Sequence, residues 1–479
     1  MHINMNTNCG ILVTSCLTLF PFKGIAQSKQ PNIILINIDD LGWTDMSSNG
    51  SSYYETPNID KLRQQGVWFN EAYAGAANSA PSRACLLTGQ YTPRHGMFTV
   101  GEPNRGKSSE RKLIAVPNRE VLEPGIQMLP QILKDAGYQT CHIGKWHVTD
   151  NPLRNGMEQN IAGNHAGHPK SYFPPYKNPN LKDGEKGEFL MDRLGNEAVK
   201  YLKQVDKTRP FFLYYATYAV HTPLQAEADL IDKYKKKVTM EAHNNPVYAA
   251  MVEAMDRNVG KVLATVREMG IEEKTLIVFT SDNGGVYKVS RQWPLRSGKG
   301  SFYEGGIRVP LIVYQKGRFE KGEIKDLPVL QFDLFPTFME LAGVDTRELL
   351  LDGKSLFPLL QNHTKGYGKR SLFWHFPAYL EGDEVDMIES GTPYFRTRPV
   401  SVVRQGDWKL IEHYETGKLE LYNIRQDISE KKDLSVTNPR KAKELYELLE
   451  KWKKEVNAPE PTSLNPDYKY YKTNSDSIK

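Results

Sequence analysis

The sequence predicts an α/β fold: a large, mainly parallel β-sheet sandwiched by helices, followed by a smaller C-terminal antiparallel sheet plus helix. The first supporting observation is a series of short apolar runs that end in polar residues, a pattern typical of buried parallel strands. The second is that helical patterns lie between these runs, as in proteins whose strands and helices alternate. The third is a change, towards the C-terminus, to short strands separated by turn residues.

Four apolar runs are the predicted strands of the large sheet. They cover residues 32–38, 139–143, 211–216 and 275–280. The clearest helical patterns between them cover residues 128–136 and 248–269. Because ligands bind beyond the carboxyl ends of the strands in such sheets, we expect the polar residues that follow the strands to meet at one site. These residues are Asp39, Asp40, Lys145, His147, His221, Asp282 and Asn283.

The C-terminal unit is predicted from three short strands and one helix. The strands cover residues 399–404, 408–413 and 418–422. The helix covers residues 439–456, and its apolar side chains form one stripe that can pack on a sheet. We therefore expect a subdomain over residues 366–479, docked on a main domain over residues 27–365.

The composition is that of an ordinary globular protein. The chain of 479 residues is 39% hydrophobic, which excludes a disordered chain because enough apolar surface is present to form a core. The net charge of +5 is small for this length, and lysines are interspersed with glutamates. We therefore expect no nucleic-acid partner.

The N-terminus has the pattern of a secretory signal. Residues 10–22 are mostly apolar, and small residues follow up to Ala26, which predicts a signal peptide over residues 1–26. The apolar run is too short to cross a bilayer comfortably, so we expect an exported protein, periplasmic or secreted, without a membrane span. A retained hydrophobic leader, or a lipoprotein anchored through Cys16, are the alternatives.

Two acidic pairs, each directly after an apolar run, suggest a metal site. Asp39 and Asp40 follow one predicted strand, and Asp282 and Asn283 follow another. All four supply oxygen ligands, which suit a hard cation such as Ca²⁺ better than zinc. A helix cap or turn would explain either pair alone, but two pairs at two strand ends favour one bound calcium ion per chain.

The most specific stretch is Ser79 to Gly89, which begins as a small-residue turn around Pro81 and enters a helix. A helix N-terminus suits an anion, and a serine there needs a base or a metal to become a nucleophile. The alternative from this window alone is that Ser79 caps the helix and Arg83 lies on the surface.

This stretch resembles the signature of the type I sulfatases, the formylglycine-dependent branch of the alkaline phosphatase superfamily, which includes arylsulfatases and N-acetylgalactosamine-6-sulfatases. That signature is Cys or Ser, then x-Pro-Ser-Arg, with Leu-Thr-Gly a few residues later. The resemblance extends from Asn32 to about Trp452, and further motifs appear in family order. They are Ile38 to Gly42, Gly144 to His147, His221 to Pro223, Ser281 to Gly284, Gly298 to Gly300 and Glu304 to Gly306.

The resemblance implies an alkaline phosphatase-like fold with the sulfatase catalytic domain over residues 27–365. It also implies that Ser79 is oxidised to formylglycine (3-oxoalanine) by a transient partner, a serine-type radical maturase of bacteria. Once hydrated, the formylglycine has two hydroxyls: one attacks the sulfur of a sulfate ester, and the other later expels sulfate. A plain serine has no second hydroxyl for this elimination.

The resemblance also implies roles for the residues around the formylglycine. Arg83 and Lys145 would hold its hydrate and offset the charge of the metal site. His147 would be the base for the elimination, whereas His221 and Lys299 would bind sulfate and protonate the leaving oxygen. Histidine suits these proton transfers because its ordinary pKa is about 6.5.

The substrate is expected to be a sulfated saccharide of host or algal glycans. We expect exo-acting removal of O-sulfate from galactose or an N-acetylhexosamine. His165 and His168, in a polar loop, and Trp374 and His375, at the start of the C-terminal unit, are the candidate sugar contacts, although packing would explain each equally well.

Two other functions fit parts of the sequence. One is a phosphatase or phosphonate monoester hydrolase of the same superfamily, and the other is a non-catalytic protein that binds sulfated glycans. The oxygen-only metal site and the close match to the signature favour the sulfatase over the first, and the presence of every motif residue favours it over the second.

Overall fold

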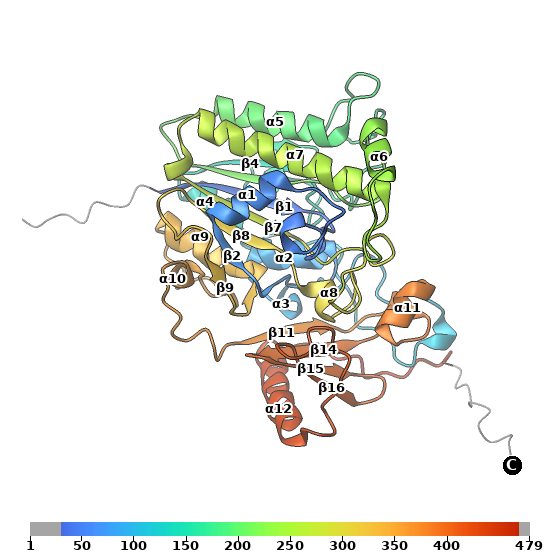
Figure 1. Ribbon diagram of the computed structural model, residues 1–479. Coiled ribbons are helices and arrows are strands. Elements are labelled where there is room, and N and C mark those ends of the chain that lie inside the picture. The colour runs from blue at the N-terminus through green and yellow to red at the C-terminus, as the bar shows by residue number, and fades with distance from the viewer. Residues whose placement is uncertain (1–29, 469–479) are drawn as a thin grey trace, which may run out of the picture.

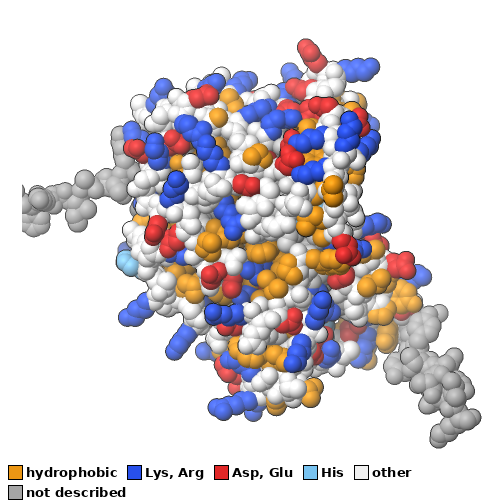
Figure 2. Space-filling view, in the orientation of Figure 1, with side chains coloured by type: hydrophobic (Ala, Val, Ile, Leu, Met, Phe, Trp, Pro, Cys, Tyr) orange, Lys and Arg blue, Asp and Glu red, His pale blue; other side chains and the backbone are white. Residues whose placement is uncertain are grey.

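The computed structural model describes residues 30–468, so the predicted signal peptide lies outside the described residues. The chain forms a large domain around a central sheet and a smaller domain packed against its lower side (Figure 1). Within residues 30–468, no helix has both the length and the apolar character needed to cross a bilayer. Lys and Arg side chains are interspersed with Asp and Glu over the face shown in Figure 2.

The central sheet has eight strands in the order β5-β4-β6-β1-β7-β8-β2-β9. Their bounds are β1 Asn32–Ile38, β2 Val67–Phe69, β4 Gln139–Gly144, β5 Gln159–Ile161, β6 Phe211–Ala216, β7 Thr275–Ser281, β8 Leu311–Tyr314 and β9 Ile324–Lys325. The four predicted strands are its central members, and they pair in parallel, which confirms the predicted fold class. Only β8 runs antiparallel to its neighbours in this sheet.

Helices cover both faces of this sheet because successive side chains of a strand point to opposite faces. Ile34 and Ile36 of β1 pack in one hydrophobic cluster, and Ile33 and Leu35 pack in another. The first face is covered by α1 (Pro57–Gln65), α5 (Leu190–Gln204), α6 (Ala228–Lys235) and α7 (Pro246–Glu268). The second is covered by α2 (Ser79–Thr88), α4 (Leu129–Asp135), α9 (Leu334–Ala342) and α10 (Phe357–Leu360).

The smaller domain is an antiparallel sheet with one long helix packed on it. The strands, in the order β11-β14-β15-β16, are β11 Ser371–Phe376, β14 Val400–Gln405, β15 Trp408–His413 and β16 Lys418–Asn423. The helix α12 (Pro439–Glu455) lies against them and buries Leu445, Leu449 and Trp452. The sequence predicted three of these strands and the helix; β11 was not predicted as a strand.

The remaining elements are short. They are α3 (Thr92–His95), α8 (Glu304–Ile307), α11 (Glu384–Ser390), β3 (Ala72–Tyr73), β10 (Val329–Leu330), β12 (Leu380–Glu381), β13 (Phe395–Thr397), and the 3₁₀ helices η1 (Ser47–Asn49), η2 (Ser108–Glu110), η3 (Pro152–Asn155), η4 (Glu272–Lys274) and η5 (Gln331–Asp333).

A buried charged cluster joins the two domains. Lys409 of β15 is fully buried between two carboxylates, with its Nζ 3.1 Å from Glu304 Oε1 and 2.8 Å from Glu430 Oε1. Glu304 begins α8 in the large domain, and its backbone N–H donates to Glu430 Oε2. Burial and the neighbouring Glu304 raise the pKa of Glu430 to about 7 despite the opposing effect of Lys409.

Candidate active site

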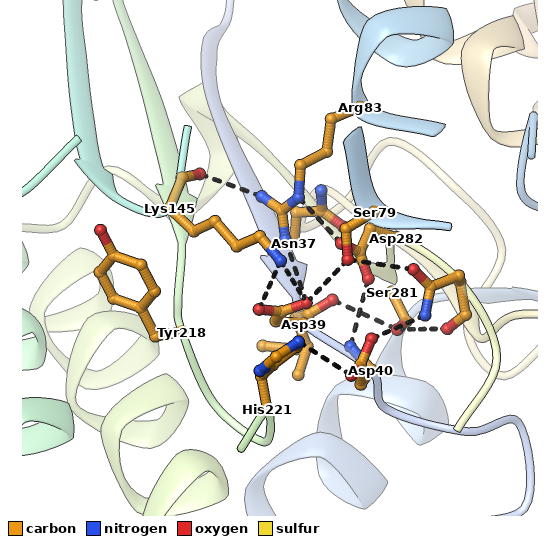
Figure 3. A network of polar contacts seen from close by, with 12 residues as sticks. Asn37, Asp39, Asp40, Ser79, Arg83, Lys145, Tyr218, His221, Ser281 and Asp282 are labelled. Atoms are coloured by element: carbon orange, nitrogen blue, oxygen red, sulfur yellow. Dashed lines mark hydrogen bonds and ion pairs between the residues drawn. The ribbon is translucent and has the colours of Figure 1, made fainter. Parts of the chain in front are cut away.

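The predicted catalytic and metal-binding residues lie together at the carboxyl ends of the central strands (Figure 3). Asp39 follows β1, Lys145 follows β4 and Asp282 follows β7, while Ser79 is the first residue of α2. His221 lies in the loop after β6. Parallel strands deliver these side chains to one edge of the sheet, as the sequence predicted.

The register of β1 and β7 brings the two acidic pairs into contact. Ile38 is paired with Ser281, and the N–H of Asp282 donates to the carbonyl of Ile38 at 3.0 Å. The N–H of Asp40 then donates to Asp282 Oδ1 at 3.2 Å, and Asn283 Nδ2 donates to Asp40 Oδ1 at 2.8 Å. Asp40 has a φ of +62°, a left-handed conformation that costs energy and is concentrated at functional sites.

The side chain of Ser79 points into this acidic cluster (Figure 3). Its Oγ lies 3.2 Å from Asp39 Oδ1 and 3.2 Å from Asn283 Oδ1. Among the described residues, no histidine nitrogen is hydrogen-bonded to this hydroxyl, so the serine lacks the adjacent base that would activate it. The oxygen of residue 79 is placed instead among groups that bind cations.

Three cations balance the three carboxylates. Arg83 Nε lies 2.8 Å from Asp282 Oδ2, and Lys145 Nζ lies 2.8 Å from Asp39 Oδ2. Lys299 Nζ lies 2.6 Å from Asp40 Oδ1. Arg83 is fully buried, which makes the surface-arginine alternative wrong. Its Nη2 has no hydrogen-bond partner among the described residues, so one donor of the guanidinium is left for another ligand.

The three carboxylates are not stabilised equally by these cations. Burial, together with the neighbouring Asp282 and Asp40, raises the pKa of Asp39 to about 7 although Lys145 and Arg83 oppose this shift. Burial also raises the pKa of Asp40, but Lys299 and His221 lower it more, so it ends well below its ordinary range. A further cation beside Asp39 would stabilise its ionised form.

One ligand atom each of Asp39, Asp40 and His221 lies within 4.8 Å of the others. Nε2 of His221 is 3.6 Å from Asp40 Oδ2, and its Nδ1 is 2.8 Å from the carbonyl of Thr222. Since a carbonyl only accepts, Nδ1 carries the proton, and Nε2 of the neutral ring is free to accept one. Burial and the nearby Lys299 lower the pKa of His221 to about 3.

His147 lies on the other side of the cluster, after β4. It is buried, its Nδ1 has no hydrogen-bond partner among the described residues, and its φ is +69°. Burial, followed by Lys145 and Arg83, lowers the pKa of His147 well below its ordinary value, so the ring is neutral. A neutral, unpartnered imidazole held in a strained conformation can accept a proton.

The loop containing His165 and His168 lies against these two histidines. The ring of His165 is 6.0 Å from that of His147, and the ring of His168 stacks on His221 at 5.9 Å and 12°. Gly167 packs so closely that a Cβ there would lie 2.6 Å from the His147 ring, so only glycine fits. The structure therefore brings both predicted sugar contacts to the site.

The prediction that Trp374 and His375 lie at the rim of the pocket is wrong. Both residues belong to β11 and are buried. Trp374 Nε1 donates to the carbonyl of Ala74 at 2.8 Å, and its ring packs on Tyr73. The His375 ring nitrogens lie 2.7 Å from Ser401 Oγ and 2.9 Å from the carbonyl of Pro459. Their side chains serve the packing between the domains and within the small sheet.

Sequence reasoning missed Asp45, a buried residue whose hydrogen bonds connect the turn after β1 to the loop that precedes Lys299. Its carboxylate accepts hydrogen bonds from Gly42 N (2.9 Å), Tyr248 Oη (2.6 Å), Ser290 Oγ (2.7 Å) and Gln292 Nε2 (2.9 Å). The signal that could have identified Asp45 is that it is a third aspartate in the turn that begins with Asp39 and Asp40.

Comparisons with known proteins agree with this geometry. The family model "Sulfatase" matches residues 31–344, and the family model "N-sulphoglucosamine sulphohydrolase, C-terminal" matches residues 298–458. A protein of Formosa agariphila described as "Sulfatase" is 33% identical, with 90% of this chain and 89% of that protein covered. N-acetylgalactosamine-6-sulfatase of Canis lupus familiaris is 31% identical, with 70% of this chain and 67% of that protein covered.

A solved structure described as "Ps i-CgsB in complex with k-i-k-neocarrahexaose" is 32% identical, with a TM-score of 0.73. The match covers 91% of this chain and 95% of that one. The family model thus covers more than half of this chain, and the two sequence relatives and the solved structure match 70% to 91% of it. The chain belongs to the sulfatase family and is a sulfuric ester hydrolase.

Proposed function

We propose that the enzyme is an exo-acting carbohydrate sulfatase that removes O-sulfate from galactose or an N-acetylhexosamine in host or algal glycans. The observation that carries the proposal is the position of residue 79. Its side-chain oxygen lies 3.2 Å from Asp39 Oδ1 and 3.2 Å from Asn283 Oδ1, two of the proposed metal ligands, in a cluster that contains Arg83 and Lys145. The similarity to an N-acetylgalactosamine-6-sulfatase and to a structure described with an oligosaccharide supports a sugar substrate.

The donor set fits one calcium ion. Asp39, Asp40, Asp282 and Asn283 would hold it, because all four are buried and offer only oxygen ligands. The raised pKa of Asp39 supports a further cation there, since the protein's own cations leave this carboxylate undercompensated. A bound Ca²⁺ would offset the charge of a sulfate ester and polarise its oxygens.

Formylglycine at position 79, made by a serine-type maturase before export, would supply a hydrated aldehyde as the nucleophile. Around it, Arg83 and Lys145 hold negative charge at residue 79. The ammonium of Lys299 lies beside Asp40 and carries a proton that it can donate to the leaving oxygen. His221 would bind the sulfate there, and His147, whose ring is neutral, would accept a proton in the elimination step.

The sugar itself would be contacted by His165 and His168. These rings form the outer layer over His147 and His221, so a sulfate in the site would place its sugar against them. Of the four sugar contacts predicted from the sequence, these two are the ones that lie at the site.

Removal of calcium is expected to lower kcat by at least about 100-fold, because the sulfate charge would lose its largest compensating charge. Turnover is measured after dialysis against a chelator and again after Ca²⁺ is added back.

Added Ca²⁺ should also raise the melting temperature of the chelated protein, since ligands that bind only the folded state stabilise it. Asp40→Asn should lose this rise, whereas Asp256→Asn, a buried carboxylate of α7 outside the site, should keep it. Equal melting temperatures with and without Ca²⁺ would contradict the calcium site.

The ester specificity is tested with 4-nitrophenyl sulfate and 4-nitrophenyl phosphate on protein from a host that has the maturase. We expect kcat/KM to favour the sulfate, and peptide mass spectrometry to show the loss of two hydrogens at Ser79. Active protein with an unmodified serine and a preference for phosphate would establish a phosphoesterase instead. Protein that is modified and folded but turns over neither aryl ester nor a sulfated saccharide would leave a glycan-binding function.

A further inference from the structure

We propose that Arg291 and Trp293 form a second glycan-binding site, which holds an anionic sugar residue of the same chain some residues away from the sulfate ester that is cleaved. This inference rests on the proposed function, because it assumes that the substrate is a sulfated glycan. It adds a chain-binding surface to the cleavage site, and it implies that longer chains are the better substrates.

Trp293 is the residue that first marks this surface. The protein has seven tryptophans, all within the described range, and Trp293 is the exposed one, at 40%. The indole is held in place by a hydrogen bond that its Nε1 donates to Tyr287 Oη at 3.2 Å. An exposed aromatic ring that is held in place offers its face to the C–H groups of a sugar at little entropic cost.

The ring borders a cavity of about 650 Å³, a size typical of ligand sites. Its other lining residues include Pro294, Ile388, Glu389 and Lys431. Ile388 of α11 is 74% exposed, and Figure 2 shows hydrophobic side chains exposed in this part of the molecule. Trp293 and Ile388, two large apolar side chains, are thus exposed to solvent in the same cavity.

Two cations at this surface are available to an anion, although the carboxylate of Glu389 also lines the cavity. The Arg291 guanidinium lies 5.3 Å from the Trp293 ring and has no carboxylate within ion-pair distance among residues 30–468. Lys431, which lines the cavity, is exposed and likewise has no ion pair in the described range. By contrast, Lys288 pairs with Asp383. An unpaired guanidinium beside an aromatic face can bind a sulfate group while the sugar ring stacks on the indole.

This surface is rigidly connected to the catalytic side. A Cβ on Gly298, the residue before Lys299, would lie 3.0 Å from Tyr287 Cβ, and the N–H of Lys299 donates to the carbonyl of Gly285 at 2.8 Å. Trp293 is therefore connected to the loop that carries Lys299 through Tyr287, to which its indole donates a hydrogen bond. Gln292, between Arg291 and Trp293, is buried in the Asp45 network. We therefore expect a glycan with its sulfate at Lys299 to reach this surface with a sugar beyond its first.

The test compares substrates of increasing length. Steady-state kinetics are measured with 4-nitrophenyl sulfate, a sulfated monosaccharide, and sulfated oligosaccharides of about two to eight residues. For the wild type, kcat/KM should rise with length. Trp293→Ala should lower kcat/KM for the longest chains by about 10-fold, mainly through KM, and should leave the aryl sulfate unchanged within about 2-fold. Trp293→Phe should restore most of the loss because it keeps an aromatic face.

Arg291→Ala should give a similar loss, and its effect should shrink at high salt because it removes a charge contact at the surface. Lys443→Ala, an exposed cation of α12, is the matched control and should change nothing. The inference is overturned if the wild type shows no dependence on length, or if Trp293→Ala affects all substrates equally.

The inference and the proposed function fail in distinguishable ways. If the wild type cleaves the aryl sulfate but Trp293→Ala has no effect on long chains, the second site is wrong and the sulfatase stands. If no sulfate ester of any length is cleaved, the substrate proposal fails, and titration calorimetry with the longest oligosaccharide then decides the second site. Equal affinity of the wild type and Trp293→Ala in that titration would overturn it.

Discussion

Ser79→Ala is expected to abolish sulfate ester hydrolysis, with a loss in kcat of more than about 10³-fold, the scale on which an enzyme loses rate when its nucleophile is removed. Alanine cannot become formylglycine, and it removes the oxygen that lies 3.2 Å from Asp39 and from Asn283. The measurement is single-turnover and steady-state hydrolysis of 4-nitrophenyl sulfate by purified variants from the same host.

The fold should survive this change, because the hydroxyl contributes only these two long hydrogen bonds. We expect the melting temperature of Ser79→Ala to stay within a few degrees of the wild type. Thr88→Ser, at the other end of α2, is the matched control and should remain active. Residual activity of Ser79→Ala above about a tenth of the wild-type value would show that residue 79 is not the nucleophile.

Lys409→Ala is expected to lower the free energy of unfolding by about 3–5 kcal/mol, the range measured when one partner of a buried ion pair is removed. Its ammonium is fully buried between Glu304 and Glu430, so its loss leaves two carboxylates facing each other in the interior. Urea unfolding followed by fluorescence and by circular dichroism measures the change and tests whether the two domains unfold together.

The control for this prediction is Lys418→Ala on the neighbouring strand β16. Lys418 is 57% exposed and contacts Glu420 at 2.9 Å, so its loss should cost less than about 1 kcal/mol. If Lys409→Ala does not fold, the double variant Lys409→Ala/Glu430→Gln should recover part of the stability, because it removes the buried charge of Glu430, whereas Glu304 keeps Arg308 and Arg404 within ion-pair distance. A cost below about 1 kcal/mol for Lys409→Ala would mean that the cluster does not hold the domains together.

The cluster also connects stability with the site. Glu304 lies five residues after Lys299, in the same segment that leads from the active site into α8. A loss of Lys409 should therefore loosen the loop of Lys299 before it unfolds the central sheet. This link explains how the small domain can influence the large one although none of the predicted catalytic residues belongs to it.

Much of the active site was predictable because parallel strands order their residues strictly. The runs 32–38 and 275–280 were predicted as strands, and the structure has them as Asn32–Ile38 and Thr275–Ser281. Side-by-side strands place the residues that follow them side by side as well, so Asp39 and Asp282 had to meet once these strands paired. The helix that begins at Ser79 follows from a small-residue turn with Pro81 in its first turn.

The rim of the pocket was not predictable in the same way. Trp374 and His375 have the residue types of a sugar-binding site, yet they point to opposite faces of a strand and both are buried. An aromatic residue or a histidine suits either environment, and the sequence around it does not say which face of a short strand will be covered. His165 and His168 have the same residue types, but their loop packs on His147 and His221.

The sequence by itself determined the order of strands and helices, the fold class and the residues at the strand ends, since these depend on local patterns and on the rules of parallel sheets. Only the tertiary structure decided the antiparallel insertion of β8, the burial of β11, the Asp45 network and the Lys409 cluster. Each of these depends on contacts between segments far apart in the chain. Such contacts are set by packing and by the pairing of buried polar groups, which no local pattern records.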